Sequence, residues 1–277
     1  LAMTAAAPVV SAAKKRIPIG LELFSVRDEL KNDLMGTIRD VGKLGYDGVE
    51  FFSPYYSWST DQAKDVRKLL DEVGMKCFST HNSTKSFSRD GADKAIELNQ
   101  ILGSRYIVMA SAGKVEGLDG WKKVAELLNE GAERMKRAGI RAGYHNHQTE
   151  FRVIEGKRPI EVIAANTNKE IALQLDIGTV LEVGGDPVAW IRANPGRIKS
   201  IHCKEWSPEK GYKALFGEGK APWKEIFAAA EKVGGVEYYL IEQEGADIPP
   251  MQTVEKCLAN IRKLRGERPK KAVRSQT

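Results

Sequence analysis

The chain has 277 residues, of which 42% are hydrophobic, so it can bury the core of one large α/β domain or of two small ones. The net charge of +6 is concentrated near the ends, because residues 14–16 contribute +3 and residues 265–277 contribute +4, which leaves −1 for residues 17–264. A body with this charge lacks the basic surface that nucleic acid requires, and we expect no nucleic-acid partner.

The first sixteen residues differ from the rest in composition. The segment "LAMTAAAPVVSAAKKR" is small, apolar and proline-containing. It fits the end of a signal peptide cleaved near residues 10–13, which would make the protein periplasmic or exported, and it fits equally a disordered leader of a cytoplasmic protein. Residues 265–277 are expected to form a basic tail. No run of 18 apolar residues occurs, so we expect no membrane-spanning helix.

Short apolar runs alternate with amphipathic stretches through the body. The runs predict eight strands, at residues 17–24, 48–52, 76–80, 106–110, 140–145, 171–176, 198–202 and 238–242. Helical spacing follows several of them, as in "DLMGTIRDVGKLG", "DQAKDVRKLLDEVG", "KKVAELLNEGAERMKRAG" and "PWKEIFAAAEKVGG", which end in the glycine typical of helix C-caps. Eight such units predict a single (β/α)₈ TIM-barrel domain over residues 17–264. The alternative is an open doubly wound sheet, but no G-x-G-x-x-G follows the first strand.

A parallel barrel places its chemistry at the C-terminal ends of its strands, where the loops converge. The predicted ends of six strands carry ionisable residues, and all four histidines of the chain are among them: Glu50, His81, His145, His147, Asp176, His202 and Glu242. Each alone is more often a hydrogen-bonded loop residue, a helix N-cap or a solvated charge than a functional residue. Their convergence on one mouth indicates a functional site.

The residues predicted at the ends of strands five to eight suit a divalent metal. His145 and His202 would supply imidazole nitrogens, and Asp176 and Glu242 carboxylate oxygens. This mixed set fits Mn²⁺, Mg²⁺, Co²⁺, Fe²⁺ or Zn²⁺ with open positions for substrate oxygens. An ion so held polarises a carbonyl and stabilises an enediolate as a proton leaves the adjacent carbon. We therefore expect one divalent ion and a small substrate that carries a carbonyl group.

A family resemblance appears at these positions. The motifs that carry it are "IGLELFSVRDEL", "GYDGVEFF", "GYHNHQTEF", "LQLDIGTVLEVGGDPVAWI", "GRIKSIHCKEW", "FGEGKAPWKEIF" and "YYLIEQE". Together they resemble the xylose isomerase-like TIM barrels, the sugar phosphate isomerase/epimerase group in the superfamily of AP endonuclease family 2. The resemblance implies a metal-dependent sugar isomerase or epimerase whose metal is bound by Glu, Asp, His and Glu from the last four strands. Asp176, His202 and Glu242 match the last three ligands.

The first ligand position departs from the family pattern, because it falls on His145 where sugar epimerases have Glu. Related epimerases resemble a two-base device with glutamates on opposite faces, so this departure leaves Glu242 alone on its face. Glu150 could replace the missing carboxylate as ligand or base, or it could cap the following helix. His147 could bind substrate or act as base. A second departure is Thr179, where many relatives have His.

These departures leave other functions open. Family members with a "YHNH" motif look like enzymes that act on 3-keto-glycosides, which remove a proton next to the ketone and expel the glycosidic oxygen; this lyase reaction needs only one base. A non-catalytic sugar-binding barrel would keep the pocket. An apurinic endonuclease would need a trinuclear zinc site and a basic face for DNA, and both the four histidines and the body charge of −1 argue against it.

Several residues near the predicted mouth are candidate substrate contacts: Glu50, His81, His147, Lys204, Trp206 and Glu244. Lys204 suits contact with a substrate oxygen or phosphate, and the plain alternative is a solvated lysine at the rim. Trp206 suits stacking on a sugar face, and the plain alternative is a ring packed under a loop. The oligomeric state stays open, a homo-oligomer included.

Overall fold

The computed structural model describes residues 16–267, which form a closed barrel of eight parallel strands. The strands are β1 (Ile19–Glu22), β2 (Gly48–Phe51), β3 (Lys76–Ser83), β4 (Tyr106–Ser111), β5 (Arg141–His145), β6 (Ala172–Asp176), β7 (Ser200–Cys203) and β8 (Tyr238–Ile241). Each strand pairs with the next along the chain, and β1 pairs with β8. The predicted (β/α)₈ fold is confirmed, and each predicted strand overlaps an observed one. The predicted leader up to residue 15 and the tail beyond residue 267 lie outside the described residues.

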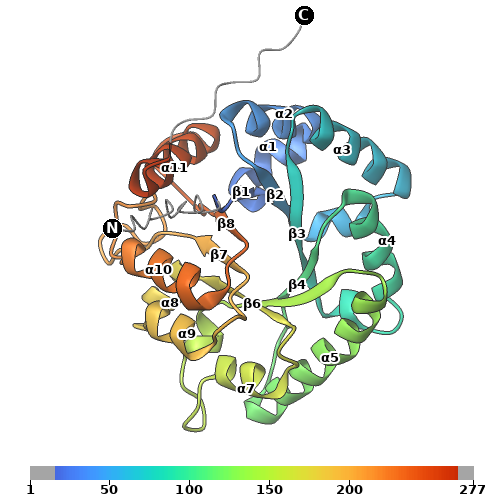
Figure 1. Ribbon diagram of the computed structural model, residues 1–277, viewed down its shortest axis with the longest axis vertical. Coiled ribbons are helices and arrows are strands. Elements are labelled where there is room, and N and C mark those ends of the chain that lie inside the picture. The colour runs from blue at the N-terminus through green and yellow to red at the C-terminus, as the bar shows by residue number, and fades with distance from the viewer. Residues whose placement is uncertain (1–15, 268–277) are drawn as a thin grey trace, which may run out of the picture.

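Helices surround the strands (Figure 1). The α-helices are α1 (Arg27–Asn32), α2 (Leu34–Leu44), α3 (Thr60–Glu72), α4 (Ala92–Leu102), α5 (Gly117–Arg137), α6 (Gln148–Phe151), α7 (Pro159–Asn166), α8 (Ile177–Glu182), α9 (Pro187–Ala193), α10 (Trp223–Ala229) and α11 (Pro250–Arg265). Short 3₁₀ turns occur at η1 (Leu23–Val26), η2 (Ser53–Ser57) and η3 (Thr84–Phe87), and a π turn, η4 (Ala230–Gly234), extends α10.

Two helix ends illustrate how the sequence shapes this outer layer. α2 ends at Gly45, whose φ of 92° is readily adopted by glycine, as the glycine pattern predicts. α11 continues to Arg265, so the helix reaches into the segment assigned above to the basic tail. Within residues 16–267, no helix is long and apolar enough to cross a membrane.

Apolar and aromatic side chains fill the interior of the barrel below the site: Phe78, Tyr106, Val108, Ala172, Tyr238 and Leu240. The register between β2 and β3 shifts at this level and leaves Phe78 without a partner on β2, as in a β-bulge that redirects a side chain. Gly20 and Gly48 make room for its ring, because a Cβ at Gly48 would lie 2.8 Å from it. This floor closes one end of the interior, and the polar side chains gather at the other.

Candidate metal centre and active site

The four predicted metal ligands lie at the C-terminal ends of four adjacent strands. His145 ends β5, Asp176 ends β6, His202 lies in β7, and Glu242 directly follows β8. One ligand atom from each lies within 4.8 Å of the others, and all four side chains are buried. The structure therefore brings together two imidazoles and two carboxylates that could hold a metal ion.

His145 is oriented as a metal ligand would be. Its Nδ1 lies 2.9 Å from Gln174 Oε1, and its Nε2 faces Asp176 Oδ2 at 3.9 Å. Metal–ligand bonds of about 2.0–2.2 Å place two ligand atoms up to about 4.4 Å apart, so this separation suits a shared ion. Burial, followed by the charges of His202 and His81, holds the pKa of His145 well below its usual value. The imidazole is therefore neutral, which is the form that binds metal.

His202 lies between two carboxylates. Its Nε2 is 2.7 Å from Glu50 Oε1, and its Nδ1 is 2.8 Å from Glu242 Oε2. Burial alone would lower the pKa of His202, but the charges and hydrogen bonds of these carboxylates raise it to about 10. An ion bound by both His202 and Glu242 would displace the proton between them. A carboxylate behind a ligating histidine is the usual support of such a ligand, so the donor set fits a divalent ion.

Glu50, a predicted substrate contact, is enclosed by protein donors. Its Oε1 lies near both His202 and His81 Nε2, the latter at 2.9 Å. Its Oε2 accepts hydrogen bonds from Ser79 Oγ and, at 2.8 Å, from Gln174 Nε2. The side chain has no solvent exposure. This arrangement places Glu50 behind the imidazoles, where it orients them.

His81 borders the four-residue group. Its Nε2 also lies 2.7 Å from Gln174 Oε1, and its ring is stacked on that of His202 with centroids 5.1 Å apart. One ligand atom each of His81, His145 and His202 lies within 4.8 Å of the others. His81 thus lies against both candidate imidazole ligands, and its side chain is 11% exposed.

Lys204 is buried in the site and is not a solvated lysine at its rim. Its Nζ lies 3.2 Å from Asp176 Oδ2, 3.7 Å from Glu242 Oε2 and 2.6 Å from Glu244 Oε1. Burial lowers the pKa of Lys204, but these carboxylates outweigh burial and raise it well above its usual value. The ammonium is therefore charged and lies beside two candidate metal ligands. From there it can reach an oxygen of a substrate bound at the cluster.

Glu150 and His147 lie outside the group of four candidate metal ligands. Glu150 Oε1 accepts a hydrogen bond from Tyr144 Oη at 2.6 Å, and its Oε2 accepts one from the backbone N–H of His147 at 2.9 Å. Both oxygens are thus engaged at the start of α6, which is the capping role given above as an alternative. His147 is exposed, and its ring centroid lies 4.9 Å from that of His145. It therefore stands at the rim next to a candidate ligand.

Trp206 and Glu244 lie farther out. Trp206 is half-buried in the segment that follows β7. The side chain of Glu244 is 34% exposed and contacts the site through Lys204. Neither residue lies in the metal-binding group.

Glu22 and Gln174 lie in the site but were not predicted as site residues. Glu22, at the end of β1, is completely buried, and neither of its oxygens has a hydrogen-bond partner among the described residues. Gln174 bridges His145, His81 and Glu50. Strand periodicity could have found both, because Gln174 lies two residues before Asp176 and Glu22 ends the first strand in "IGLE".

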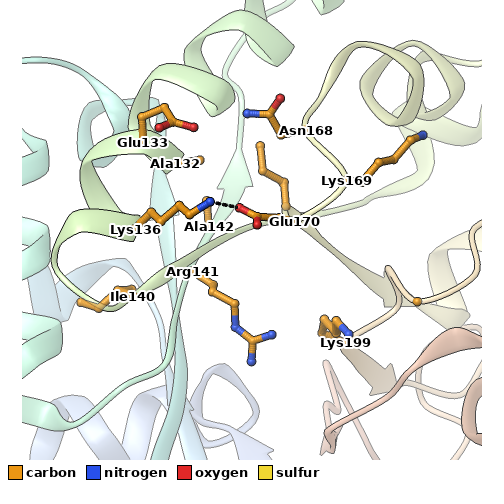
Figure 2. Close-up of a pocket in the computed structure, with 12 residues that line it drawn as sticks. Ala132, Glu133, Lys136, Ile140, Arg141, Ala142, Asn168, Lys169, Glu170 and Lys199 are labelled. Atoms are coloured by element: carbon orange, nitrogen blue, oxygen red, sulfur yellow. Dashed lines mark hydrogen bonds and ion pairs between the residues drawn. The ribbon is translucent and has the colours of Figure 1, made fainter.

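A hollow of about 380 Å³ lies at the opposite end of the barrel, near the starts of β5, β6 and β7. Figure 2 shows Lys136 paired with Glu170 at its wall, at 2.7 Å, with Arg141 and Lys199 farther along the wall. None of the predicted site residues lines it. Since the chemistry of (β/α)₈ enzymes lies at the other end of the strands, we assign this hollow no part in a reaction.

Comparisons with known proteins agree with the observed fold. A family model described as xylose isomerase-like TIM barrel matches residues 38–264. The chain is 25% identical over 189 residues to the rhizopine catabolism protein MocC of Rhizobium meliloti, a match that covers 61% of this chain and 56% of MocC. It is 21% identical over 209 residues to a 3-dehydroshikimate dehydratase of Pseudomonas aeruginosa, covering 69% of this chain and 33% of the dehydratase. The chain thus spans about half or less of these curated relatives.

A solved structure matches more of the chain. It is a sugar phosphate isomerase/epimerase from Parabacteroides distasonis, with a TM-score of 0.76 and 26% identity. The match covers 91% of this chain and 96% of that protein. The barrel and its order of elements are therefore shared over almost the whole of both chains.

Proposed function

Because the chain belongs to the family of xylose isomerase-like TIM barrels, we propose that it is a divalent-metal-dependent enzyme that isomerises or epimerises a small sugar or keto-sugar. The observation that carries this proposal is the buried group of His145, Asp176, His202 and Glu242, with one ligand atom of each within 4.8 Å of the others. The reaction removes a proton from a carbon next to a carbonyl and returns it.

The position of each side chain in the site indicates its role. A divalent ion held by the four-residue group would polarise the sugar carbonyl and so acidify the neighbouring C–H bond. Burial raises the pKa of Glu242, but the charge of Lys204 and the hydrogen bond to His202 outweigh burial and hold it well below its usual value, so Glu242 stays ionised as a ligand. The ammonium of Lys204 supplies a fixed positive charge for a substrate oxygen. Glu50 keeps His202 in place.

We assign proton transfer to His147. Its exposed ring stands at the rim beside His145, and imidazole is the side chain that most often transfers protons in enzymes. Glu150 accepts the backbone N–H of His147 and is itself held by Tyr144. Glu150 is therefore a positioning residue, which fixes the turn that carries the imidazole.

One observation favours elimination from a 3-keto-glycoside as a second candidate. Both oxygens of Glu150 are engaged, whereas an epimerase that returns a proton to the opposite face uses a second base. In the elimination, one base takes the proton next to the ketone, the C–H electron pair forms a C=C bond, and the C–O bond to the glycosidic oxygen breaks. The leaving oxygen takes a proton from the ammonium of Lys204. One curated relative is named as a dehydratase, and dehydration is also an elimination.

Solvent deuterium exchange tests the proposal. The wild-type protein with Mn²⁺, incubated in D₂O with D-fructose or a 3-keto-glucoside, should place deuterium on the carbon next to the carbonyl, as followed by NMR. His147→Ala should keep its metal in elemental analysis but slow the exchange by about 10²-fold or more. His145→Ala should lose the metal. The NMR spectrum also separates an epimer from the unsaturated product of elimination.

Two outcomes would contradict parts of this scheme. If Glu150→Gln strips the metal while His145→Ala keeps it, Glu150 is the fourth ligand and His145 is not. If metal-loaded wild-type protein exchanges no deuterium into either sugar but binds one of them, the protein is a sugar-binding barrel without this activity.

A further inference from the structure

A hollow of about 180 Å³ opens beside the metal-binding group, between the segments that follow β1 and β8. Glu244 forms part of its wall, and Glu244 Oε1 accepts a hydrogen bond from Lys204 Nζ at 2.6 Å. The same Nζ lies 3.2 Å from Asp176 Oδ2. Glu244 therefore links the wall of the hollow to Asp176, a candidate metal ligand, through the single side chain of Lys204.

The hollow is too small to enclose a drug-sized ligand. Pockets that enclose drug-sized molecules measure about 300 Å³ or more. A volume of 180 Å³ corresponds to about six water molecules at liquid density. It therefore suits one ring-sized part of a larger molecule, whose reacting part lies at the metal group.

The charged groups of the lining are mainly acidic. Asp28, Glu29 and Glu244 face the hollow with Arg27 as the cation. Glu29 Oε2 is shielded from solvent and has no hydrogen-bond partner among the described residues. The guanidinium of Arg27 is held over the ring of Phe24 at 4.5 Å, and its Nη1 donates to the Phe24 carbonyl at 3.0 Å. The lining thus offers several acceptors and one oriented donor.

We propose that this hollow is a subsite for a second, uncharged polyhydroxy group, so that the substrate is a neutral glycoside and not a sugar phosphate. The carboxyl oxygens of Asp28 and Glu29 can accept hydrogen bonds from sugar hydroxyls, and Arg27 can donate to a ring or bridging oxygen. The excess of carboxylates repels a phosphate group. The inference rests on the proposed function only in placing the reacting sugar at the metal group.

Calorimetric titration of the full-length, Mn²⁺-loaded protein with cellobiose, glucose and glucose 6-phosphate tests the subsite. These probes report binding, so the result does not depend on turnover. Ala246→Phe fills the hollow, because Ala246 is part of its lining. Ala165→Phe is the matched control, since Ala165 lines a hollow of about 420 Å³ beside α7. Glu29→Gln is a second test variant that keeps the size of the side chain.

We expect cellobiose to bind at least about tenfold more tightly than glucose in the wild type and in Ala165→Phe, and glucose 6-phosphate to bind no better than glucose. Ala246→Phe should remove the advantage of cellobiose without changing glucose affinity, and Glu29→Gln should reduce it. The proposal is overturned if cellobiose has no advantage, if both test variants keep it, or if glucose 6-phosphate binds more tightly than cellobiose. If cellobiose binds more tightly than glucose but no deuterium enters any keto-sugar, the subsite is supported and the proposed function is rejected. If deuterium enters a keto-sugar but cellobiose binds no more tightly than glucose, the proposed function is supported and the subsite is rejected.

Discussion

The burial of the Glu22 carboxyl group lowers the stability of the fold. Its carboxyl group is completely buried, and neither oxygen makes a hydrogen bond of good geometry among residues 16–267, although the backbone N–H of Phe24 lies nearby. Burial, and then the charges of Glu50 and Glu242, raises the pKa of Glu22 well above its usual value. A buried polar group without a partner destabilises a protein by about 1–3 kcal/mol. Such a cost is common at functional sites, where the arrangement of charges serves the reaction.

Replacing Glu22 by an apolar side chain of similar length should therefore stabilise the fold. We expect Glu22→Met to raise the free energy of unfolding of the chelator-treated protein by about 1–3 kcal/mol, or about 2–4 °C in Tm per kcal/mol. Glu237→Met is the control, because that carboxylate is paired with Arg141, and its loss should destabilise. Thermal unfolding measures both. A loss of stability in Glu22→Met equal to that of the control would show that Glu22 has a stabilising partner.

Glu50 gives a prediction about metal affinity. Its Oε1 lies 2.7 Å from His202 Nε2, so Glu50→Gln removes the charge that orients this imidazole. Loss of such a supporting group typically weakens metal binding about 10–100-fold. We expect this loss in Mn²⁺ titration of Glu50→Gln, and no change in Glu72→Gln, whose side chain is exposed at the end of α3. Equal Mn²⁺ affinity in the wild type, Glu50→Gln and Glu72→Gln would show that Glu50 does not support the metal site.

The segment between β7 and α10, residues 204–222, packs against the site. The ring of Tyr212 lies 4.7 Å from Lys204 Nζ. Its hydroxyl donates to Glu182 Oε2 at 2.5 Å and accepts from Gln148 Nε2 at 2.7 Å, so it joins this segment to α8 and α6. The four candidate metal ligands are at most 6% exposed beneath these contacts. The contacts of Tyr212 therefore hold this segment next to the buried metal-binding group.

Removal of the Tyr212 hydroxyl should loosen the segment between β7 and α10. We expect Tyr212→Phe to increase backbone hydrogen exchange within residues 205–221 without a comparable change in the strands, because the bonds to two helices are lost. Tyr56→Phe is the matched control, since the Tyr56 hydroxyl donates to the backbone of Gly91 near α4, away from this segment. Unchanged exchange in residues 205–221 would show that other contacts hold the segment closed.

Local sequence patterns were enough to predict the barrel and the clustering of the candidate metal ligands. The C-terminal ends of all strands in a parallel barrel lie at the same end of the barrel, whichever residues surround them. Local patterns could not predict contacts set by tertiary structure. The inward turn of Phe78 depends on the register of β3 against β2. The ring that packs on Lys204 belongs to Tyr212, which lies in a long segment without periodicity. The engagement of Glu150 depends on Tyr144, whose hydroxyl reaches it only after β5 turns into α6.

Glu237 ties distant strands together at the end of the barrel opposite the site. It precedes β8, and both of its oxygens accept hydrogen bonds from Arg141 Nη2, at the start of β5, at 2.8 Å. Arg105 Nη2, just before β4, lies 2.9 Å from Glu237 Oε2. Since these strands are far apart in the sequence, the ion pairs help to hold the closed barrel as one unit.

This cluster predicts the direction of a pH effect on stability. Burial alone would raise the pKa of Glu237, but the hydrogen bonds and charge of Arg141, with the charge of Arg105, outweigh burial and hold it below its usual value. The folded state therefore binds fewer protons at Glu237 than the unfolded state. Its stabilisation is fully present above the unfolded pKa of about 4.3 and is lost as the pH falls through the lower pKa of the folded state.

Urea unfolding at pH 7, 5, 4 and 3 should reveal this loss. Glu237→Gln should lower the free energy of unfolding by about 1 kcal/mol at pH 7, and its difference from the wild type should narrow between pH 5 and pH 3, where the wild-type carboxylate takes up a proton. Glu161→Gln is the control, because the Glu161 side chain pairs with Arg158 but is 41% exposed, so solvent screens the pair and the change should be smaller. A difference at pH 3 as large as at pH 7 would mean that Glu237 stabilises the barrel through packing and not through its charge.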